Sequence, residues 1–415
     1  FDAPPEWSAE ALGFLKQNGY RPEGDTARTM FDRLCKLRPA EGRHLRLYLT
    51  VPVCRTVLKA HEHGVRTLAF ARDGKTLATG SNDTSTLLWE LPAGRVKARL
   101  AGQAGPVLAL AFSPDGKSLL VGRGDNTARL WDAPARKLKG TFQGHTDRVT
   151  AVGFSPDGQT VGTGSNDNSL RLWEPASKAC RAVLQGHERG VMALAFSPDG
   201  KMVASGSHDE TVILWYAMSG QRQATLRGHA SSIFTLAYSP DGRTLATGSS
   251  DGTIRLWNLP DGELRGVLEG HKGTVMTLAF SPDGKKLATG SLDKTVRLWD
   301  WAIGQAKTTL HGHTDEINSL AFSPDGKTLA TGSRDSTARI WELASLKSLV
   351  AMTREDLEQV QKWAEVLPNP EEARVWHFVA ALLRHRFRFD IELSEVAERV
   401  LGEFDIEIDT RVSET

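Results

Sequence analysis

Short segments in which apolar and polar residues alternate recur along the middle of the chain. The segment VMALAFSP (191–198) is one of them, and its alternation is typical of a half-buried β-strand. The Pro-Asp-Gly that follows predicts a tight turn, because proline sets φ, aspartate caps the turn and glycine completes it. The segments KTLATGS (75–81), TVRLW (295–299) and RAVLQGH (181–187) predict the second, third and fourth strands of the same unit.

The four-strand unit repeats with a period of 42 residues. Seven of the eleven tryptophans follow this period: Trp89, Trp131, Trp173, Trp215, Trp257, Trp299 and Trp341. Each is preceded, 28 residues earlier, by a histidine or, once, a glutamine: His61, Gln103, His145, His187, His229, His271 and His313. One unit alone is a small antiparallel sheet with two exposed edges, which is unstable. Because radial stacking hides the faces of such sheets, the pattern predicts a ring of repeats.

The Gly-His, Ser-x-Asp and Trp motifs at these spacings resemble the WD40 repeat family over roughly residues 53–352. The resemblance implies an all-β fold, a seven-bladed β-propeller. In that family the histidine, serine, aspartate and tryptophan of one blade form a hydrogen-bonded network. The matching set here is His145, Ser165, Asp167 and Trp173. A buried aspartate costs several kcal/mol unless partners satisfy it, so these residues recur together without any need for catalysis.

The second repeat departs from this pattern. Gln103 stands in place of the histidine and Arg123 in place of the serine, while Asp125 and Trp131 are kept. We expect a rebuilt network in which Arg123 faces Asp125. The blade should still form. Its altered network makes it either the least rigid of the seven blades or one that is adapted to a function.

Two segments compete to close the ring. CRTVLKAH (54–61) aligns with the fourth strand of a repeat, and ELASLKSLVAM (342–352) follows the last tryptophan. In the WD40 family an N-terminal strand completes the last blade, which favours residues 54–59. The segment after Trp341 would then leave the ring or add a fifth strand.

Two flanks, 1–52 and 353–415, surround the predicted propeller. The first flank predicts helices at 8–19 and 25–37 and an alternating stretch at 44–51. The second predicts a helix at 353–367 and another from Pro370 to the RHRFR of 384–388, followed by two acidic alternating strands at 389–393 and 404–409. Their apolar faces cover either the propeller or another protein, since edge strands are templates for a partner.

Composition indicates a globular protein with 24% charged and 40% hydrophobic residues. The formal net charge of +1 removes the electrostatic argument for a dedicated nucleic-acid binder. Cys35, Cys54 and Cys180 show no paired spacing, so we expect a reducing, cytoplasmic compartment. No apolar run reaches transmembrane length, so no membrane partner is expected. Phe1 raises the alternative that the chain is a piece of a longer protein with catalytic activity elsewhere.

The sequence contains few residues that could form a metal-binding or catalytic site. His61-x-His63 and His311-x-His313 have metal-ligand spacing, but each includes a repeat histidine and no cysteine or carboxylate cluster accompanies them. The acids of the last strands, Asp390, Glu392, Asp405, Glu407 and Asp409, alternate as on the wet face of a strand. Phosphate-binding loops and nucleophile elbows are missing from the sequence. We therefore predict no enzyme, no metal, no cofactor and no small-molecule substrate.

Positions that are the same in every repeat maintain the fold, whereas positions that vary between repeats indicate residues used for function. The residue after the one that opens each first strand varies: Arg66, Leu108, Thr150, Met192, Phe234, Met276 and Asn318. The WD40 resemblance implies that this strand lines the central channel and begins near its top face. Repeats four to six would then present Met192, Phe234 and Met276 side by side.

A second variable position lies inside Ser-x-Asp. It is occupied by Asn82, Gly124, Asn166, His208, Ser250, Leu292 and Arg334. The resemblance places these loops on the same face, so His208 and Leu292 extend an apolar arc while Arg66, Asn318 and Arg334 form a basic, polar flank.

From these two rings we predict a non-enzymatic scaffold that binds a protein or peptide on its top face, within a multiprotein assembly. The predicted contact residues are Leu108, Met192, Phe234, Met276, His208, Leu292, Arg66, Asn318 and Arg334. One alternative is that the ring residues pack together and plug the channel. Another is nucleic-acid binding through Arg66, Arg123, Arg334 and residues 384–388.

Overall fold

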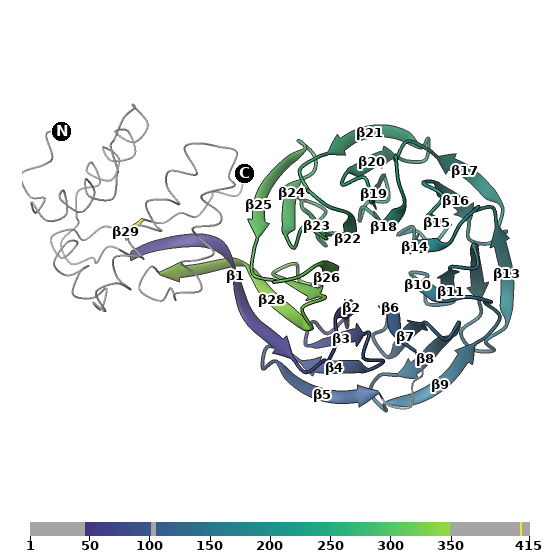
Figure 1. Ribbon diagram of the computed structural model, residues 1–415, viewed down its shortest axis with the longest axis horizontal. Helices are drawn as coiled ribbons and strands as arrows, with labels where there is room; N and C mark the ends of the chain where they lie inside the picture. Colours follow the sequence, from purple (N-terminus) through teal and green to yellow (C-terminus); the bar gives the residue numbers. More distant parts are fainter. Residues whose placement is uncertain (1–45, 101–104, 349–406, 409–415) are drawn as a thin grey trace, which may run out of the picture. The chain divides into compact units, whose positions relative to one another are not determined.

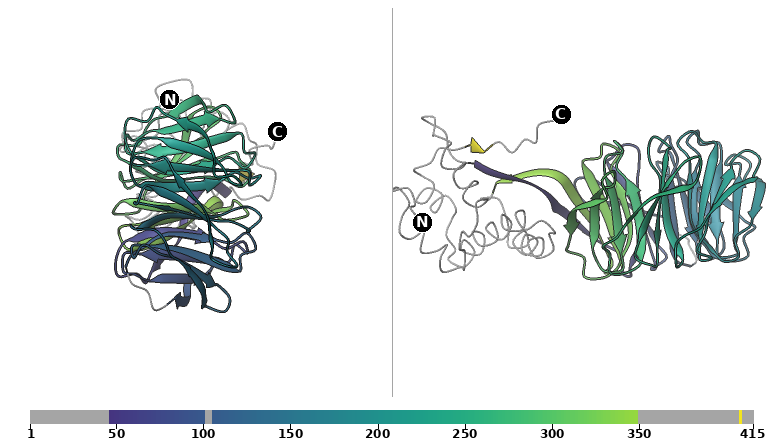
Figure 2. Two further views of the ribbon diagram at one scale, coloured as in Figure 1. Left: turned by 90° about the vertical axis from the view of Figure 1, so that its right-hand side faces the viewer. Right: turned by 90° about the horizontal axis from the view of Figure 1, so that it is seen from above.

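The computed structural model describes residues 46–100, 105–348 and 407–408. The chain divides into two compact units, Cys54–Leu343 and the combination of Phe1–Val53 with Ala344–Thr415. In the first unit, seven sheets stand radially around a common centre (Figure 1). Seen from the side, their strands run between the two faces of the ring (Figure 2). The predicted seven-bladed β-propeller is confirmed.

Six blades are antiparallel sheets of four strands in sequence order. Blade 1 contains β2 (Val65–Phe70), β3 (Thr76–Ser81), β4 (Thr86–Glu90) and β5 (Arg95–Leu100). Blade 2 contains β6 (Val107–Phe112), β7 (Ser118–Arg123), β8 (Ala128–Asp132) and β9 (Lys137–Phe142). Blade 3 contains β10 (Val149–Phe154), β11 (Val161–Ser165), β12 (Ser169–Trp173) and β13 (Cys180–Gln185).

The numbering continues around the ring. Blade 4 contains β14 (Val191–Phe196), β15 (Met202–Ser207), β16 (Val212–Tyr216) and β17 (Arg222–Leu226). Blade 5 contains β18 (Ile233–Tyr238), β19 (Thr244–Ser249), β20 (Ile254–Asn258) and β21 (Glu263–Leu268). Blade 6 contains β22 (Val275–Phe280), β23 (Leu287–Ser291), β24 (Val296–Asp300) and β25 (Gln305–Leu310).

Blade 7 joins the two ends of the ring. Its sheet contains β26 (Ile317–Phe322), β27 (Thr328–Ser333) and β28 (Thr337–Ser348), followed by β1 (Arg46–Lys59). The N-terminal strand is therefore the outer strand of the last blade, as expected for residues 54–59. The segment after Trp341 prolongs β28 to Ser348.

The core lies between neighbouring sheets. The first strands supply a fully buried residue at each junction, such as Val191, and the second strands a glycine opposite it. A Cβ atom on Gly164 would lie 2.7 Å from Cγ1 of Val191 in the next blade. Glycine is needed here because the sheets approach too closely for any side chain.

In the second unit the described residues form one short pairing. Arg46 and Leu47 of β1 pair in parallel with Glu407 and Ile408, which form β29. This strand lies inside the predicted strand 404–409. The predicted helices of both flanks and the strand 389–393 lie outside the described residues. None of the helices in the described part of the chain is long and apolar enough to span a bilayer.

Candidate functional site

A buried hydrogen-bonded network ties the second and third strands of blade 3 to the loop before the blade. His145 Nδ1 lies 2.8 Å from Asp167 Oδ2, and its Nε2 lies 2.7 Å from Thr163 Oγ1. Trp173 Nε1 donates to the same hydroxyl at 2.8 Å. Thr163 is therefore the residue that joins histidine to tryptophan, and the expected set of His145, Ser165, Asp167 and Trp173 did not include it.

Ser165 holds the loop instead. Its hydroxyl accepts from the Asp167 amide at 3.1 Å and donates to the Asp147 carbonyl at 2.9 Å. Ser165 belongs to the Ser-x-Asp motif. The bridging position lies two residues earlier, and it is threonine or serine in the six blades that contain the histidine.

The same arrangement occurs in six blades. The His–Asp pairs, each at 2.8 or 2.9 Å, are His61–Asp83, His145–Asp167, His187–Asp209, His229–Asp251, His271–Asp293 and His313–Asp335. Both ring nitrogens of His61 and of His313 are used in this way. The repeat histidine of each His-x-His pair is therefore part of a structural network.

The network controls the ionisation of its members. Burial would raise the pKa of Asp167, but hydrogen bonds from Ser169, the Thr146 amide and His145 outweigh it and lower this pKa to about 2. Burial lowers the pKa of His145, while Asp167 raises it less. Aspartate is thus an anion and histidine a neutral ring at neutral pH, so the pair is a stabilising contact between the β11–β12 turn and the loop before β10.

Blade 2 is rebuilt around Arg123, as predicted. The buried Arg123 donates to the Gly105 carbonyl at 2.6 Å, and its Nε lies 3.7 Å from Asp125 Oδ2. Arg129 donates to the same carboxylate at 2.9 Å. Burial lowers the pKa of Arg123 to about 10, partly offset by Asp125. Since Val121 replaces the bridging hydroxyl, Trp131 Nε1 has no partner among the described residues.

The first variable ring coincides with a β-bulge in every blade. The ladder between the first two strands skips one residue each time, for example Phe234 between Ile233 and Thr235. The skipped residues are Arg66, Leu108, Thr150, Met192, Phe234, Met276 and Asn318. A bulge releases a residue from the ladder and re-aims its side chain. The positions found variable in the sequence are therefore the ones the fold leaves free to differ.

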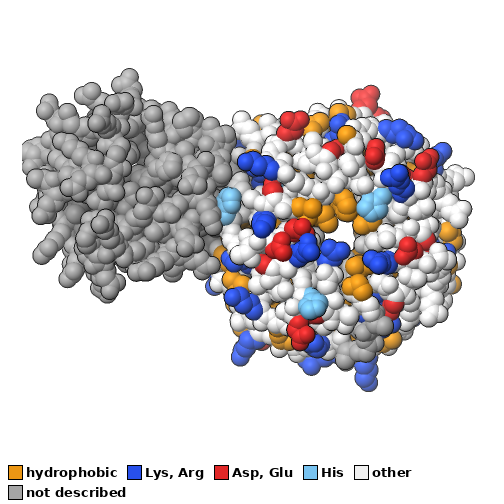
Figure 3. Space-filling view, viewed as in Figure 1, with side chains coloured by type: hydrophobic (Ala, Val, Ile, Leu, Met, Phe, Trp, Pro, Cys, Tyr) orange, Lys and Arg blue, Asp and Glu red, His pale blue; other side chains and the backbone are white. Residues whose placement is uncertain are grey.

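An apolar arc borders the channel in blades 4 to 6. We define it by Met192, His208, Phe234, Met276 and Leu292, all of which are partly exposed. The rings of His208 and Phe234 meet edge to face, with centroids 5.3 Å apart and an interplanar angle of 85°. Figure 3 shows hydrophobic side chains at the central opening on the side of β18 and β22.

The chain's repeats match a known family model. The model of the WD domain, G-beta repeat (WD40) covers residues 52–90, 94–132, 136–174, 178–216, 220–258, 262–300 and 304–342. The chain belongs to the WD40 repeat family. No curated protein matches it. WD40 propellers are typically protein-interaction modules and generally act as non-catalytic scaffolds.

A basic flank faces the apolar arc across the mouth of this WD40 propeller. Arg66 and Arg334 are exposed, and Arg334 lies 3.3 Å from Glu316. The walls of the channel exclude part of the water around Arg66 and so lower its pKa. Glu316 acts against this shift, and Arg334 and Arg148 add to it. In Figure 3, Lys and Arg side chains lie at the opening on the side of β2 and β26.

Two members of the bulge ring tie blades together. Thr150 donates to the Val191 carbonyl of the next blade, and Asn318 donates to the Val65 carbonyl at 2.9 Å. Asn318 is only 8% exposed. It therefore links blade 7 to blade 1 and offers little surface to a partner.

The remaining eight predicted residues form what we call the channel-mouth surface: Leu108, Met192, Phe234, Met276, His208, Leu292, Arg66 and Arg334. Sequence reasoning missed Arg148 and Glu316, which set the charge around Arg66. Both stand directly before a strand opener, so a comparison of the repeats one position earlier would have found them.

The contact between His208 and Phe234 gives a direct test of the arc. Burial lowers the pKa of His208, and Arg189 lowers it further. We expect Phe234→Ala to raise this pKa towards its ordinary value, because water replaces the ring. Titration by nuclear magnetic resonance measures it, with His208→Asn to assign the signal. An unchanged pKa would show that Phe234 does not shield His208.

Proposed function

We propose that the protein is a non-enzymatic scaffold that binds a protein or peptide partner on the channel-mouth surface. The observation that carries the proposal is the apolar arc: five adjacent, partly exposed apolar or neutral side chains at the rim of the channel. Covering one such side chain is worth about 1.5–3 kcal/mol in transfer free energy. A contiguous group of them beside exposed arginines has the character of a binding hot spot.

The chemistry of the surface favours particular partners. Methionine adapts to irregular shapes, so Met192 and Met276 suit an apolar side chain of a partner. Arg66, Arg334 and Arg148 bring three positive charges near one carboxylate, Glu316, which favours an acidic group beside that apolar side chain. Nucleic-acid binding is less favoured, because Arg123, one of the residues predicted for it, is buried. Within this proposal the protein acts in the cytoplasm, as the unpaired spacing of its cysteines favours.

The proposal is tested by removing the arc. The variant Met192→Ser/Phe234→Ser/Met276→Ser should fold, because all three side chains are partly exposed and stand at bulges. Met218→Ser is the matched control, since Met218 is 82% exposed on the connection from β16 to β17. Affinity capture from lysate of the source cells, read by mass spectrometry, should recover specific partners with the wild type and the control.

The triple variant is expected to lose those partners, with affinity reduced by at least about 100-fold. Circular dichroism and thermal melting establish that it is folded. If a folded triple variant retains the same partners as the wild type, the arc is not the binding site.

A further inference from the structure

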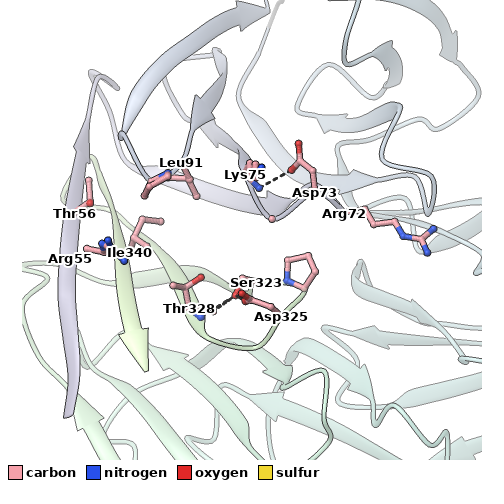
Figure 4. Close-up of a pocket in the computed structure, with 13 residues that line it drawn as sticks. Arg55, Thr56, Arg72, Asp73, Lys75, Leu91, Ser323, Asp325, Thr328 and Ile340 are labelled. Atoms are coloured by element: carbon pink, nitrogen blue, oxygen red, sulfur yellow. Dashed lines mark hydrogen bonds between the residues drawn. The ribbon is translucent and has the colours of Figure 1, made fainter. Parts of the chain in front are cut away.

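A groove opens at the seam where blade 7 meets blade 1, with a volume of about 520 Å³. Its lining includes Arg55 and Thr56 of β1, Leu91 after β4, and Thr328 and Ile340 of blade 7. Figure 4 shows Thr56, Leu91 and Ile340 together at one end, while Asp73 and Asp325 lie at the other. We call it the closure groove.

The corresponding seam between blades 5 and 6 is filled by a tryptophan. Trp301 stands where blade 1 has Leu91, five repeats earlier. The guanidinium carbon of Arg265, on the outer strand of blade 5, lies 4.8 Å from the centroid of the Trp301 ring. Phe280 meets the same ring edge to face at 5.3 Å. The indole Nε1 donates to the Gly284 carbonyl at 2.8 Å.

Blade 1 and blade 7 keep the frame that holds this indole. In the repeat register, Arg55 corresponds to Arg265, Phe70 to Phe280 and Gly74 to Gly284. Thr328 corresponds to Thr244, whose hydroxyl accepts from Arg265 at 3.2 Å.

Two changes leave the closure groove open. The shorter Leu91 replaces the indole, and Arg55 turns to Glu342 of its own blade at 3.3 Å. The Arg55 side chain is 54% exposed, and a surface ion pair of this kind is weak, so Arg55 can exchange Glu342 for another contact. Arg72 points away from the groove (Figure 4) and donates to the Pro114 carbonyl of blade 2.

We infer that the closure groove binds an aromatic side chain, a tryptophan above all, presented by a peptide segment of a partner protein. The indole lies against Leu91 and Ile340, Arg55 stacks on its face, and its N–H donates to the Gly74 carbonyl. The same chain shows this arrangement internally around Trp301. The site is distinct from the channel-mouth surface and does not depend on it.

The test uses the full chain and a small probe, N-acetyl-tryptophanamide, with N-acetyl-leucinamide as the comparison. Saturation-transfer nuclear magnetic resonance measures their binding. We expect the wild type to prefer the tryptophan probe. Leu91→Trp should weaken its binding by at least about tenfold, because the new side chain fills the groove as Trp301 fills its seam. Arg55→Ala should weaken it about threefold by removing the stacked cation.

The serine triple variant of the apolar arc separates the two sites. It should bind the tryptophan probe as the wild type does, whatever its effect on lysate partners. The inference is overturned if the wild type shows no preference for the tryptophan probe. It is also overturned if folded Leu91→Trp and Arg55→Ala both bind the probe as tightly as the wild type, or if only the triple variant loses it.

Discussion

Acidification is expected to unfold the propeller between about pH 4 and pH 2, as the aspartates of the hydrogen-bonded networks become protonated. The pKa of Asp167 is lowered to about 2 by the hydrogen bonds of its network. A carboxylate whose pKa is lower in the folded than in the unfolded state stabilises the fold above the unfolded value, about 3.9. This contribution is lost as the pH falls towards the folded pKa. For Asp167 alone it amounts to about 2 kcal/mol.

The other network aspartates act in the same direction. Their pKa values are lowered too: Asp83, Asp209, Asp251, Asp293 and Asp335. All six losses therefore act in the same direction on a domain whose total stability is typically only about 5–15 kcal/mol. Burial also lowers the pKa of His61, His145 and His313, so a smaller loss begins below about pH 6.5, where the unfolded histidines take up protons first.

Thermal melting followed by circular dichroism from pH 8 to pH 2 measures both stages. Asp167→Asn is the matched variant. It should be about 2 kcal/mol less stable than the wild type at pH 7, and this difference should shrink between about pH 4 and pH 2. A difference that stays constant over that window would mean that the charge of Asp167 does not stabilise the blade.

Thr163→Val is expected to reduce the free energy of unfolding by about 3 kcal/mol. The substitution keeps the shape of a fully buried side chain but removes the hydroxyl that joins His145 to Trp173. With His145 Nδ1 donating to Asp167, the hydroxyl donates to Nε2 and accepts from the indole N–H. Valine therefore leaves two buried polar atoms unsatisfied, and each costs about 1–3 kcal/mol.

Thr163→Ser separates the hydroxyl from the methyl group. Blade 4 has serine at this position, where Ser205 lies 2.8 Å from His187 and 2.9 Å from Trp215. The serine variant should lose only about 1 kcal/mol, the value of one buried methyl group. Urea or guanidinium unfolding at pH 7 measures both variants. Equal stability of the serine and valine variants would show that the hydroxyl bridge contributes nothing.

The repeat period allowed the ring to be predicted in detail. Residues such as Trp173 and His145 recur at fixed spacing because each blade must bury the same faces and satisfy the same aspartate. The likeness of 54–61 to RAVLQGH (181–187) left 342–352 as a second candidate for the closing strand, and the resemblance to the WD40 family favoured 54–59. The bridging hydroxyl of Thr163 was not among the predicted residues, because a sequence of alternating small polar residues does not show where the histidine ring lies.

The channel mouth could be predicted only in part. Variation between repeats marked Phe234 and its equivalents, because residues at bulges are not needed for the ladder. Whether each is exposed depends on its neighbours in the next blade. Asn318 and Phe234 occupy the same position, yet Asn318 turns down to the Val65 carbonyl, whereas Phe234 lies against His208.

By itself, the sequence of this protein determined the number of blades and the ring of variable positions, since these depend on residues that recur at one period. Only the tertiary structure decided the bridging hydroxyl, the depth of each mouth residue and the open seam beside Leu91. These depend on contacts between residues of different blades, far apart in the chain. Such contacts follow from the packing of whole sheets, which a pattern along one strand does not contain.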